Sequence, residues 1–270
     1  MTTTIPEGAR AIAIRAALDA GAILRGRLSQ TREVDYKGVI DLVTDADRAS
    51  EELIAGRIKG AFPDHGFLGE EGTRGSDGAE FSWVVDPLDG TTNYAHAYPH
   101  FAVSIALEQH GQAVLGVVYD LMRDELFVAE RGQGATLNGA PIRVSAEKEL
   151  LRSLLATGFP YNPEQRGEAL AVWNALMDAC QGVRRDGAAA LNLSWVACGR
   201  LDGFYERNLK PWDMAAGSLI VEEAGGQVSD YAGGAFDLYG IEVVAAGSEL
   251  HGLLRSVVQT TAEEARTNRA

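Results

Sequence analysis

The stretch that decides how this chain is interpreted is Trp83-Val84-Val85-Asp86-Pro87-Leu88-Asp89-Gly90-Thr91. Its first three residues are an apolar run typical of a buried strand. Pro87 predicts that the strand stops there, because proline fixes its own φ and lacks an N–H. Asp86 and Asp89 would then lie where the chain turns. Neighbouring carboxylates repel each other unless a cation neutralises them, and Mg²⁺ prefers oxygen ligands. The stretch therefore predicts a divalent-cation site.

The composition is that of an ordinary globular protein of 270 residues, 46% hydrophobic and 23% charged. A formal net charge of −14 disfavours broad binding to nucleic acid or to an anionic membrane surface. A small anionic substrate stays possible, since bound metal ions reverse the local field. The only cysteines, Cys180 and Cys198, suggest a reducing compartment. The first residues lack a signal-peptide pattern, and no stretch has transmembrane length. We expect a cytoplasmic protein without a membrane partner.

The first half combines two helices with an antiparallel meander. Apolar spacing predicts a helix from Pro6 to about Leu28 and another over residues 46–58. Residues 31–41 and 72–78 are polar or glycine-rich and predict loops. Four apolar runs separated by turn signals, among them Asn138-Gly139, predict the strands of the meander. These runs are residues 102–107, 114–119, 126–129 and 142–144.

The second half alternates strands with helices, which predicts a mixed or parallel sheet covered by helices. The predicted strands are residues 154–157, 204–205 and 243–244, and the predicted helices are residues 164–180, 188–198 and 212–224. No repeat or linker separates the halves, which divide at about residue 150. We therefore expect one packed domain over residues 1–270, with a mixed α+β and α/β fold.

Acidic residues before position 90 form three clusters, and Asp213 adds a fourth candidate. Taken singly, each cluster also has a structural explanation: Asp45, Asp47 and Asp213 suit helix starts as caps or dipole partners. Haloacid-dehalogenase phosphatases also end a strand in two aspartates, but there the acids are two residues apart and the first is a nucleophile. Asp86 and Asp89 are three apart, which disfavours a covalent aspartyl-phosphate.

Taken together, the motifs resemble those of the inositol monophosphatase family, from about residue 4 to residue 252. The sequence around Thr92-Asn93-Tyr94 is most similar to that of the bacterial inositol-1-phosphatase branch. The matching segments, in the family's order and spacing, are Asp41-Leu-Val-Thr-Asp-Ala-Asp47, Gly69-Glu-Glu71, Trp83 to Asn93, Pro211-Trp-Asp213 and Glu222-Glu-Ala-Gly-Gly226. The resemblance implies a layered αβαβα sandwich, a homodimer, and a Mg²⁺-dependent phosphate monoesterase that is inhibited by Li⁺.

The resemblance also implies roles for individual residues. Glu70, Asp86 and the Leu88 carbonyl would hold a first Mg²⁺, and Asp86, Asp89 and Asp213 a second. Glu70 would also reach a third, weaker ion. Asp47 would orient the Thr91 hydroxyl, and together they would position the attacking water. Contacts to the substrate are implied for Leu88, Asp89, Gly90, Thr91, Ala189, Glu206 and Asp213, with the phosphate on the N–H groups of Gly90 and Thr91 and a sugar hydroxyl on Glu206.

Two further positions bear on specificity. Lys37 falls where the family has a mobile loop over the metals. Ala188 falls where the family often has Ser or Thr, so a hydroxyl that could meet the substrate is missing.

The reaction implied by the resemblance is hydrolysis of inositol 1-phosphate to myo-inositol and phosphate. Histidinol phosphate, fructose 1,6-bisphosphate and 3′-phosphoadenosine phosphates stay open as substrates, because all need the same metal clamp. A different class of function is a protein partner of the transcription machinery, since some bacterial members of the family act in that way. A pure binding protein has no need of the complete acidic set, so the set favours an enzyme.

Overall fold

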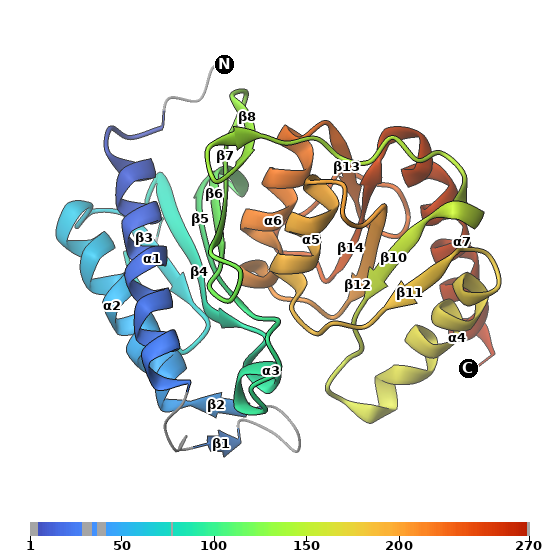
Figure 1. Cartoon of the computed structure of the whole chain (residues 1–270), viewed down its shortest axis with the longest axis horizontal. Helices are drawn as coiled ribbons and strands as arrows, with labels where there is room; N and C mark the ends of the chain where they lie inside the picture. Colours follow the sequence, from blue (N-terminus) through green and yellow to red (C-terminus); the bar gives the residue numbers. More distant parts are fainter. Residues whose placement is uncertain (1–4, 29–33, 37–41, 77, 269–270) are drawn as a thin grey trace.

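Helices and sheets alternate in five layers in the computed structural model, which describes residues 5–28, 34–36, 42–76 and 78–268 (Figure 1). Helices α1 (Ala9–Arg27) and α2 (Asp45–Ala61) cover one face of a seven-stranded sheet. Helices α5 (Ala189–Ala197) and α6 (Pro211–Glu223) fill the space between that sheet and a five-stranded one. Helices α4 (Arg166–Met177) and α7 (Ser248–Thr267) cover the far face. The predicted αβαβα sandwich is confirmed.

The seven-stranded sheet has the order β3-β4-β5-β6-β7-β8-β9 and contains the predicted meander. Asn138 and Gly139 both have positive φ, 50° and 81°, as the predicted two-residue hairpin turn requires. This turn joins two short strands, so the strand predicted at residues 142–144 is wrong and β8 was missed. The strands are β3 (Gly66–Gly69), β4 (Phe81–Asp89), β5 (Ala102–Gln109), β6 (Gln112–Asp120), β7 (Glu125–Glu130), β8 (Gly134–Leu137) and β9 (Ala140–Pro141).

The five-stranded sheet has the order β11-β10-β12-β14-β13, with β10 parallel to both of its neighbours. Its strands are β10 (Leu154–Thr157), β11 (Gly182–Arg184), β12 (Gly203–Arg207), β13 (Gly226–Ser229) and β14 (Glu242–Gly247). The short strands β11 and β13 and the long helix α7 carried no prediction. The helix predicted to start at residue 164 begins with a 3₁₀ turn, η2 (Pro163–Gln165), and another 3₁₀ turn, η1 (Leu150–Arg152), precedes β10.

The N-terminal region differs from the prediction in two places. Helix α1 begins at Ala9, after Gly8 in the left-handed conformation, rather than at Pro6. Part of the loop predicted over residues 31–41 is the strand β1 (Val34–Tyr36), which pairs antiparallel with β2 (Leu42–Thr44). The remainder of that segment, including Lys37 and Asp41, lies outside the described residues.

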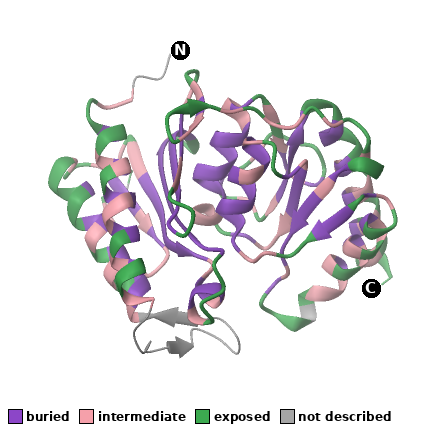
Figure 2. Cartoon of the chain, in the orientation of Figure 1, coloured by how far each residue is buried: buried purple, intermediate pink, exposed green. Residues whose placement is uncertain are grey.

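Small residues let the middle helices approach the seven-stranded sheet closely. A Cβ on Gly116 of β6 would lie 2.8 Å from the Ala216 carbonyl oxygen of α6. A Cβ on Gly217 would lie 2.6 Å from the Leu193 Cβ of α5. Both helices are almost wholly buried, in contrast to the outer ones (Figure 2). The position of α6, which begins two residues before Asp213, therefore depends on this close packing.

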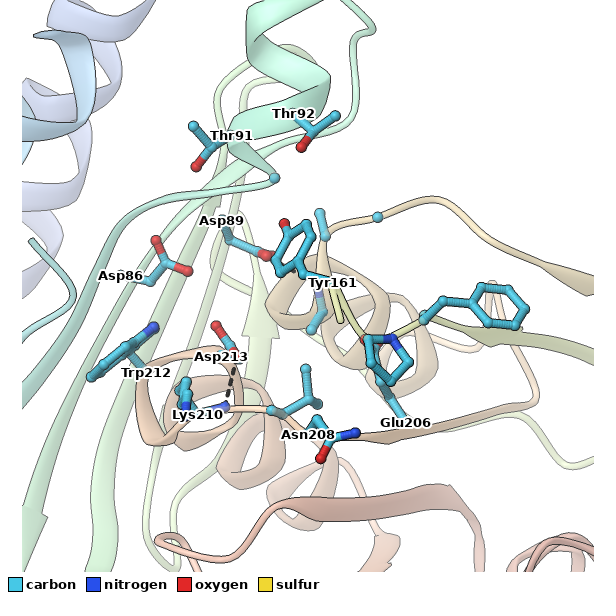
Figure 3. Close-up of a pocket in the computed structure, with 18 of the residues that line it drawn as sticks. Asp86, Asp89, Thr91, Thr92, Tyr161, Glu206, Asn208, Lys210, Trp212 and Asp213 are labelled. Carbon is cyan, nitrogen blue, oxygen red and sulfur yellow. Dashed lines mark hydrogen bonds between the residues drawn. The ribbon is translucent and has the colours of Figure 1, made fainter. Parts of the chain in front are cut away.

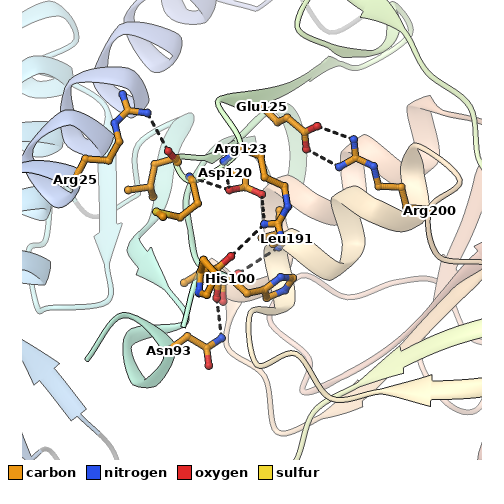
Figure 4. Close-up of polar contacts among 12 residues, drawn as sticks. Arg25, Asn93, His100, Asp120, Arg123, Glu125, Leu191 and Arg200 are labelled. Carbon is orange, nitrogen blue, oxygen red and sulfur yellow. Dashed lines mark hydrogen bonds and ion pairs between the residues drawn. The ribbon is translucent and has the colours of Figure 1, made fainter. Parts of the chain in front are cut away.

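Polar contacts also join the second half to the first (Figure 4). The Arg200 guanidinium, just after α5, donates to both oxygens of Glu125 on β7, at 2.5 and 2.6 Å.

Cys180 and Cys198 are both free thiols. Over the part of the chain that the structure describes, no helix combines the length and the apolar character needed to cross a membrane.

Candidate active site

A pocket of about 260 Å³ opens where the ends of several elements from both halves meet (Figure 3). Its walls come from the end of β4, the start of the short helix α3 (Thr91–Ala95), the turn after β10, the end of β12, and the starts of α5 and α6. All but one of the predicted site residues line it: Glu70, Asp86, Leu88, Asp89, Gly90, Thr91, Ala189, Glu206 and Asp213. The exception is Asp47, which lies behind the wall and contacts Thr91.

A bulge in β4 brings Asp86 and Asp89 to the same side. Residues three apart in a regular strand point to opposite faces. Here Asp86 is opposite Ser104 and Asp89 is opposite Ala102, so β4 holds one residue more than β5 over this interval. Pro87 therefore does not end the strand as predicted; the strand continues through a bulge to Asp89. Both carboxylates can line the pocket only because of this extra residue.

The electrostatics of these two carboxylates favour a bound cation. Burial, and then the negative charges of Glu70, Asp89 and Asp213, raise the pKa of Asp86 well above its usual value. Burial also raises the pKa of Asp89 to about 7, although backbone N–H donors work against this shift. Carboxylates in such a cluster gain from any cation that shares their oxygens.

Asp89 has a second contact that sequence reasoning missed, because it caps α5. Its Oδ1 accepts from the Ala189 N–H at 3.0 Å and its Oδ2 from the Leu191 N–H at 3.2 Å. A carboxylate at a helix N-terminus satisfies unpaired N–H groups and complements the helix dipole. The Ala189 N–H is thus already used within the protein, so this residue meets the pocket by its remaining atoms.

Asp213 is both a cap of helix α6 and a residue of the candidate site. It is the third residue of α6, and its Oδ2 accepts from the Lys210 N–H at 2.7 Å as part of a capping box. The same side chain lines the pocket. A carboxylate oxygen has two lone pairs, so the cap leaves acceptor capacity for a ligand in the pocket.

The Thr91 hydroxyl and Asp47 lie together, as the resemblance implies. The Thr91 Oγ1 is 3.0 Å from Asp47 Oδ1 and 3.1 Å from the Leu88 carbonyl oxygen. Its single proton can be donated to one of these acceptors at a time. Asp47 is completely buried on α2. When Thr91 donates to Asp47, its oxygen lone pairs are left to accept a hydrogen bond from a third group at the pocket.

Glu206 enters the pocket from the end of β12. Burial, and then the negative charge of Asp213, raise the pKa of Glu206 to about 8, while Arg185 opposes the shift. A Cβ on Gly158 would overlap the Glu206 carboxylate, so glycine at position 158 makes room for it.

The donor set suits Mg²⁺ in its chemistry, since Glu70, Asp86, Asp89 and Asp213 offer carboxylate oxygens and Leu88 a carbonyl. As the side chains lie, no three His, Cys, Asp or Glu residues of the described ranges are gathered tightly enough to hold an ion. The same carboxylates accept backbone hydrogen bonds: the Leu88 N–H donates to Asp86 at 2.9 Å, and similar contacts hold Asp89 and Asp213.

Several residues that support the site escaped the sequence analysis. The Asn93 amide donates to the carbonyls of His100 and Asp186, both at 2.7 Å, and so ties α3 to the chain before α5 (Figure 4). Ser50 and Glu51 of α2 contact the chain segments that carry the carboxylates. For Ser50 and Glu51, the only signal in the sequence is that polar residues fall on the inner face of an amphipathic helix. That pattern is too common to identify a functional residue.

Comparison with known proteins agrees with this fold. The inositol monophosphatase family profile matches residues 6–263. The chain is 46% identical over 233 residues to the inositol-1-monophosphatase of Rhizobium meliloti, covering 85% of this chain and 87% of that one. It is 44% identical over 256 residues to the Nus factor SuhB of Pseudomonas aeruginosa, covering 92% and 94%.

Among solved structures, the extragenic suppressor protein suhB of Bartonella henselae superposes with a TM-score of 0.89 at 42% identity, over 92% of this chain and 97% of that one. The protein therefore belongs to the inositol monophosphatase family.

Proposed function

We propose that this protein hydrolyses a phosphate monoester with Mg²⁺, most readily inositol 1-phosphate, to give myo-inositol and phosphate. The observation that carries the proposal is one pocket lined by five carboxylates from both halves of the chain, next to the Thr91–Asp47 contact. The name of the Rhizobium meliloti relative supports the choice of inositol phosphate.

Mg²⁺ ions, when bound, would lower the pKa of a water molecule and neutralise the charge that develops on the phosphate and the leaving oxygen. In the proposal, Glu70, Asp86 and the Leu88 carbonyl hold the first ion, and Asp86, Asp89 and Asp213 the second. Glu70 also reaches a third, weaker one.

The chain's own groups position the reactants. Asp47 accepts a hydrogen bond from the Thr91 hydroxyl, which leaves the Thr91 oxygen to accept a hydrogen bond from the attacking water and fix its direction. The N–H groups of Gly90 and Thr91 are assigned to the phosphate. Gly90, at φ 94°, has no side chain, and a Cβ there would lie 3.0 Å from the His100 carbonyl oxygen. Leu88 and Ala189 form part of the substrate wall.

Substrate selection is assigned to the part of the pocket formed by Glu206 and Ala188. Glu206 accepts a hydrogen bond from a hydroxyl of the substrate's ring, and Ala188 offers no hydroxyl of its own. The pocket volume of about 260 Å³ is below the usual range for drug-sized ligands, which suits a single sugar-sized ring.

The test is Mg²⁺-dependent phosphate release from a panel: inositol 1-phosphate, β-glycerophosphate, histidinol phosphate, fructose 1,6-bisphosphate and 3′-phosphoadenosine 5′-phosphate. We expect inositol 1-phosphate to lead and EDTA to abolish the activity. A lead for another ester would keep the mechanism and replace the substrate. Asp86→Asn is expected to abolish turnover while the fold is retained. The same experiment with added Li⁺ tests the proposed inhibition, and light scattering tests the proposed homodimer.

A second candidate is a binding role in the transcription machinery, favoured by relatives named Nus factor SuhB. The net charge of −14 makes a protein partner more suitable than direct nucleic-acid contact. If the two roles are independent, Asp86→Asn protein should retain the partner that wild-type protein captures. Absence of phosphate release from every ester of the panel would shift the weight to this role.

A further inference from the structure

Helix α2 has a buried polar stripe that faces the candidate site. Asp47, Ser50 and Glu51 follow the i, i+3, i+4 spacing that puts side chains on one helix face, and each is at most 2% exposed. Each contacts a different segment of the pocket wall. Asp47 contacts Thr91, and the Ser50 hydroxyl donates to the Pro87 carbonyl at 2.8 Å, in the bulge of β4. Glu51 contacts the segment that carries Glu70.

The two carboxylate oxygens of Glu51 accept hydrogen bonds from two different backbone N–H groups. Its Oε2 accepts from the Glu71 N–H at 2.7 Å and its Oε1 accepts from the Thr73 N–H at 2.8 Å. A Cβ on Gly69 would overlap the Glu51 carboxylate, so this glycine lets the carboxylate sit directly against the chain. The Glu51 carboxylate thus packs directly against the turn at residues 69–73 and accepts two of its N–H groups.

Glu70 lies inside the turn that Glu51 holds. The Gly69 N–H donates to the Thr73 carbonyl at 3.0 Å, and the Glu70 N–H donates to the Val85 carbonyl of β4 at 3.2 Å. The turn is therefore closed on itself, attached to β4, and fixed from behind by a carboxylate. Hydrogen bonds to an ionised acceptor are stronger than neutral ones, and a buried acceptor makes an alternative conformation costly.

We propose that Glu51 is a positioning residue that fixes the turn carrying Glu70 and so sets the affinity for the cation at this pocket. The inference rests on the proposed function, because it assigns Glu70 to a cation. Glu51 itself touches neither the cation nor the substrate. Its effect passes through the backbone N–H groups of Glu71 and Thr73.

The test is Glu51→Gln, which keeps the size of the side chain but offers one acceptor oxygen where two N–H groups point. The matched control is Glu223→Gln. Glu223 also accepts two backbone N–H groups, from Gly132 and Gly134 at 2.8 Å each, in a turn that does not line the pocket. The two substitutions therefore remove the same kind of contact at two places.

Two readouts separate positioning from general stability. In metal-free protein, amide hydrogen exchange of residues 69–74 should accelerate in Glu51→Gln and stay at the wild-type rate in Glu223→Gln. By calorimetry, the Mg²⁺ dissociation constant of Glu51→Gln should rise by about 10- to 100-fold, as for other residues that support metal ligands. Saturating Mg²⁺ should restore most of kcat, since Glu51 does not touch the reacting atoms.

The inference is overturned if Glu51→Gln binds Mg²⁺ and exchanges residues 69–74 like wild type, or if Glu223→Gln weakens Mg²⁺ equally. Should Glu51→Gln fail to fold, Glu51→Asp keeps the charge and shortens the reach; unchanged Mg²⁺ affinity in that variant also overturns it. A wild-type protein that binds no Mg²⁺ refutes the proposed function instead.

Discussion

At the scale of single residues, the contact between Thr91 and Asp47 joins two positions far apart in the sequence into one chemical unit. The Thr91 hydroxyl lies 3.0 Å from the completely buried Asp47, which is one of its two acceptors beside the Leu88 carbonyl. The unit can orient a water molecule only while the hydroxyl is present. A methyl group in its place would leave Asp47 buried without this contact.

Thr91→Ala should therefore lower kcat for inositol 1-phosphate by about 10²-fold or more, the usual size of the loss when a reactant is misplaced. KM should change little. Thr91→Ser keeps the hydroxyl and should keep most of the activity. Steady-state kinetics of the three proteins test this, and equal losses in the alanine and serine variants would contradict it.

Glu206 predicts a pH dependence of stability in metal-free protein, because its pKa of about 8 lies above its ordinary value of 4.5. Below pH 4.5 both states hold the proton, so the group contributes nothing. Between pH 4.5 and about 8 the unfolded chain loses a proton that the folded protein keeps, so this group lowers stability as the pH rises. Above that range the penalty is constant. Glu206→Gln should remove the effect.

The measurement is Tm in EDTA at pH 5 and pH 8 for wild type and Glu206→Gln. The difference between variant and wild type should be larger at pH 8. A difference that shrinks toward pH 8 would show the opposite linkage.

At the scale of elements, the site depends on how closely α6 packs on the seven-stranded sheet. Helix α6 carries Asp213 in its first turn, and small residues on both sides fix its distance from β6. Backbone atoms of α6 cannot move aside as a flexible side chain would. The position of a pocket residue is thus decided by glycine and alanine residues of the middle layer.

Gly116→Ala should lower the free energy of unfolding by about 1–3 kcal/mol, the usual cost of overpacking a core. Gly56→Ala is the matched control, because a Cβ there meets no atom within 4 Å and the residue lies in the exposed part of α2. That change should stabilise by about 0.5–1 kcal/mol. Urea denaturation measures both, and a neutral Gly116→Ala would refute the tight contact.

At the scale of the whole molecule, the pocket is lined by carboxylates from both halves. Glu70, Asp86 and Asp89 come from the part before residue 150, and Asp213 comes from the part after it. A cation that bridges them would stabilise the two halves as one unit.

Calorimetry should therefore show a single unfolding transition over residues 1–270, raised as a whole by Mg²⁺. At a concentration of 100 times the dissociation constant, the gain should be about 2.7 kcal/mol. Asp86→Asn should lose this gain. Two transitions, of which only one responds to Mg²⁺, would instead show that the halves unfold separately.

Much of this protein could be predicted from local patterns. The meander between β5 and β7 and the alternation of strands and helices after residue 150 follow from apolar spacing and turn residues. The acidic motif at Asp86 and Asp89 pointed to a cation site, and the resemblance to the inositol monophosphatase family supplied the other predicted residues that line the pocket. Some failures lie where the local pattern is weak: short strands such as β11 and β13 have too few residues for a periodic signal. That reason does not apply to α7, a 20-residue helix that also carried no prediction.

The sequence by itself determined which acidic side chains are available as oxygen ligands, and that Asp86 and Asp89 lie near the end of β4. Only the tertiary structure decided how these side chains are oriented toward the pocket. The bulge at Pro87 turns Asp86 and Asp89 to one side, and α2 contacts Glu71 and Thr91 across 20 and 44 residues of sequence. Periodicity reports the environment of a residue and its neighbours along the chain. It does not report a hydrogen bond to a segment that packing brings alongside.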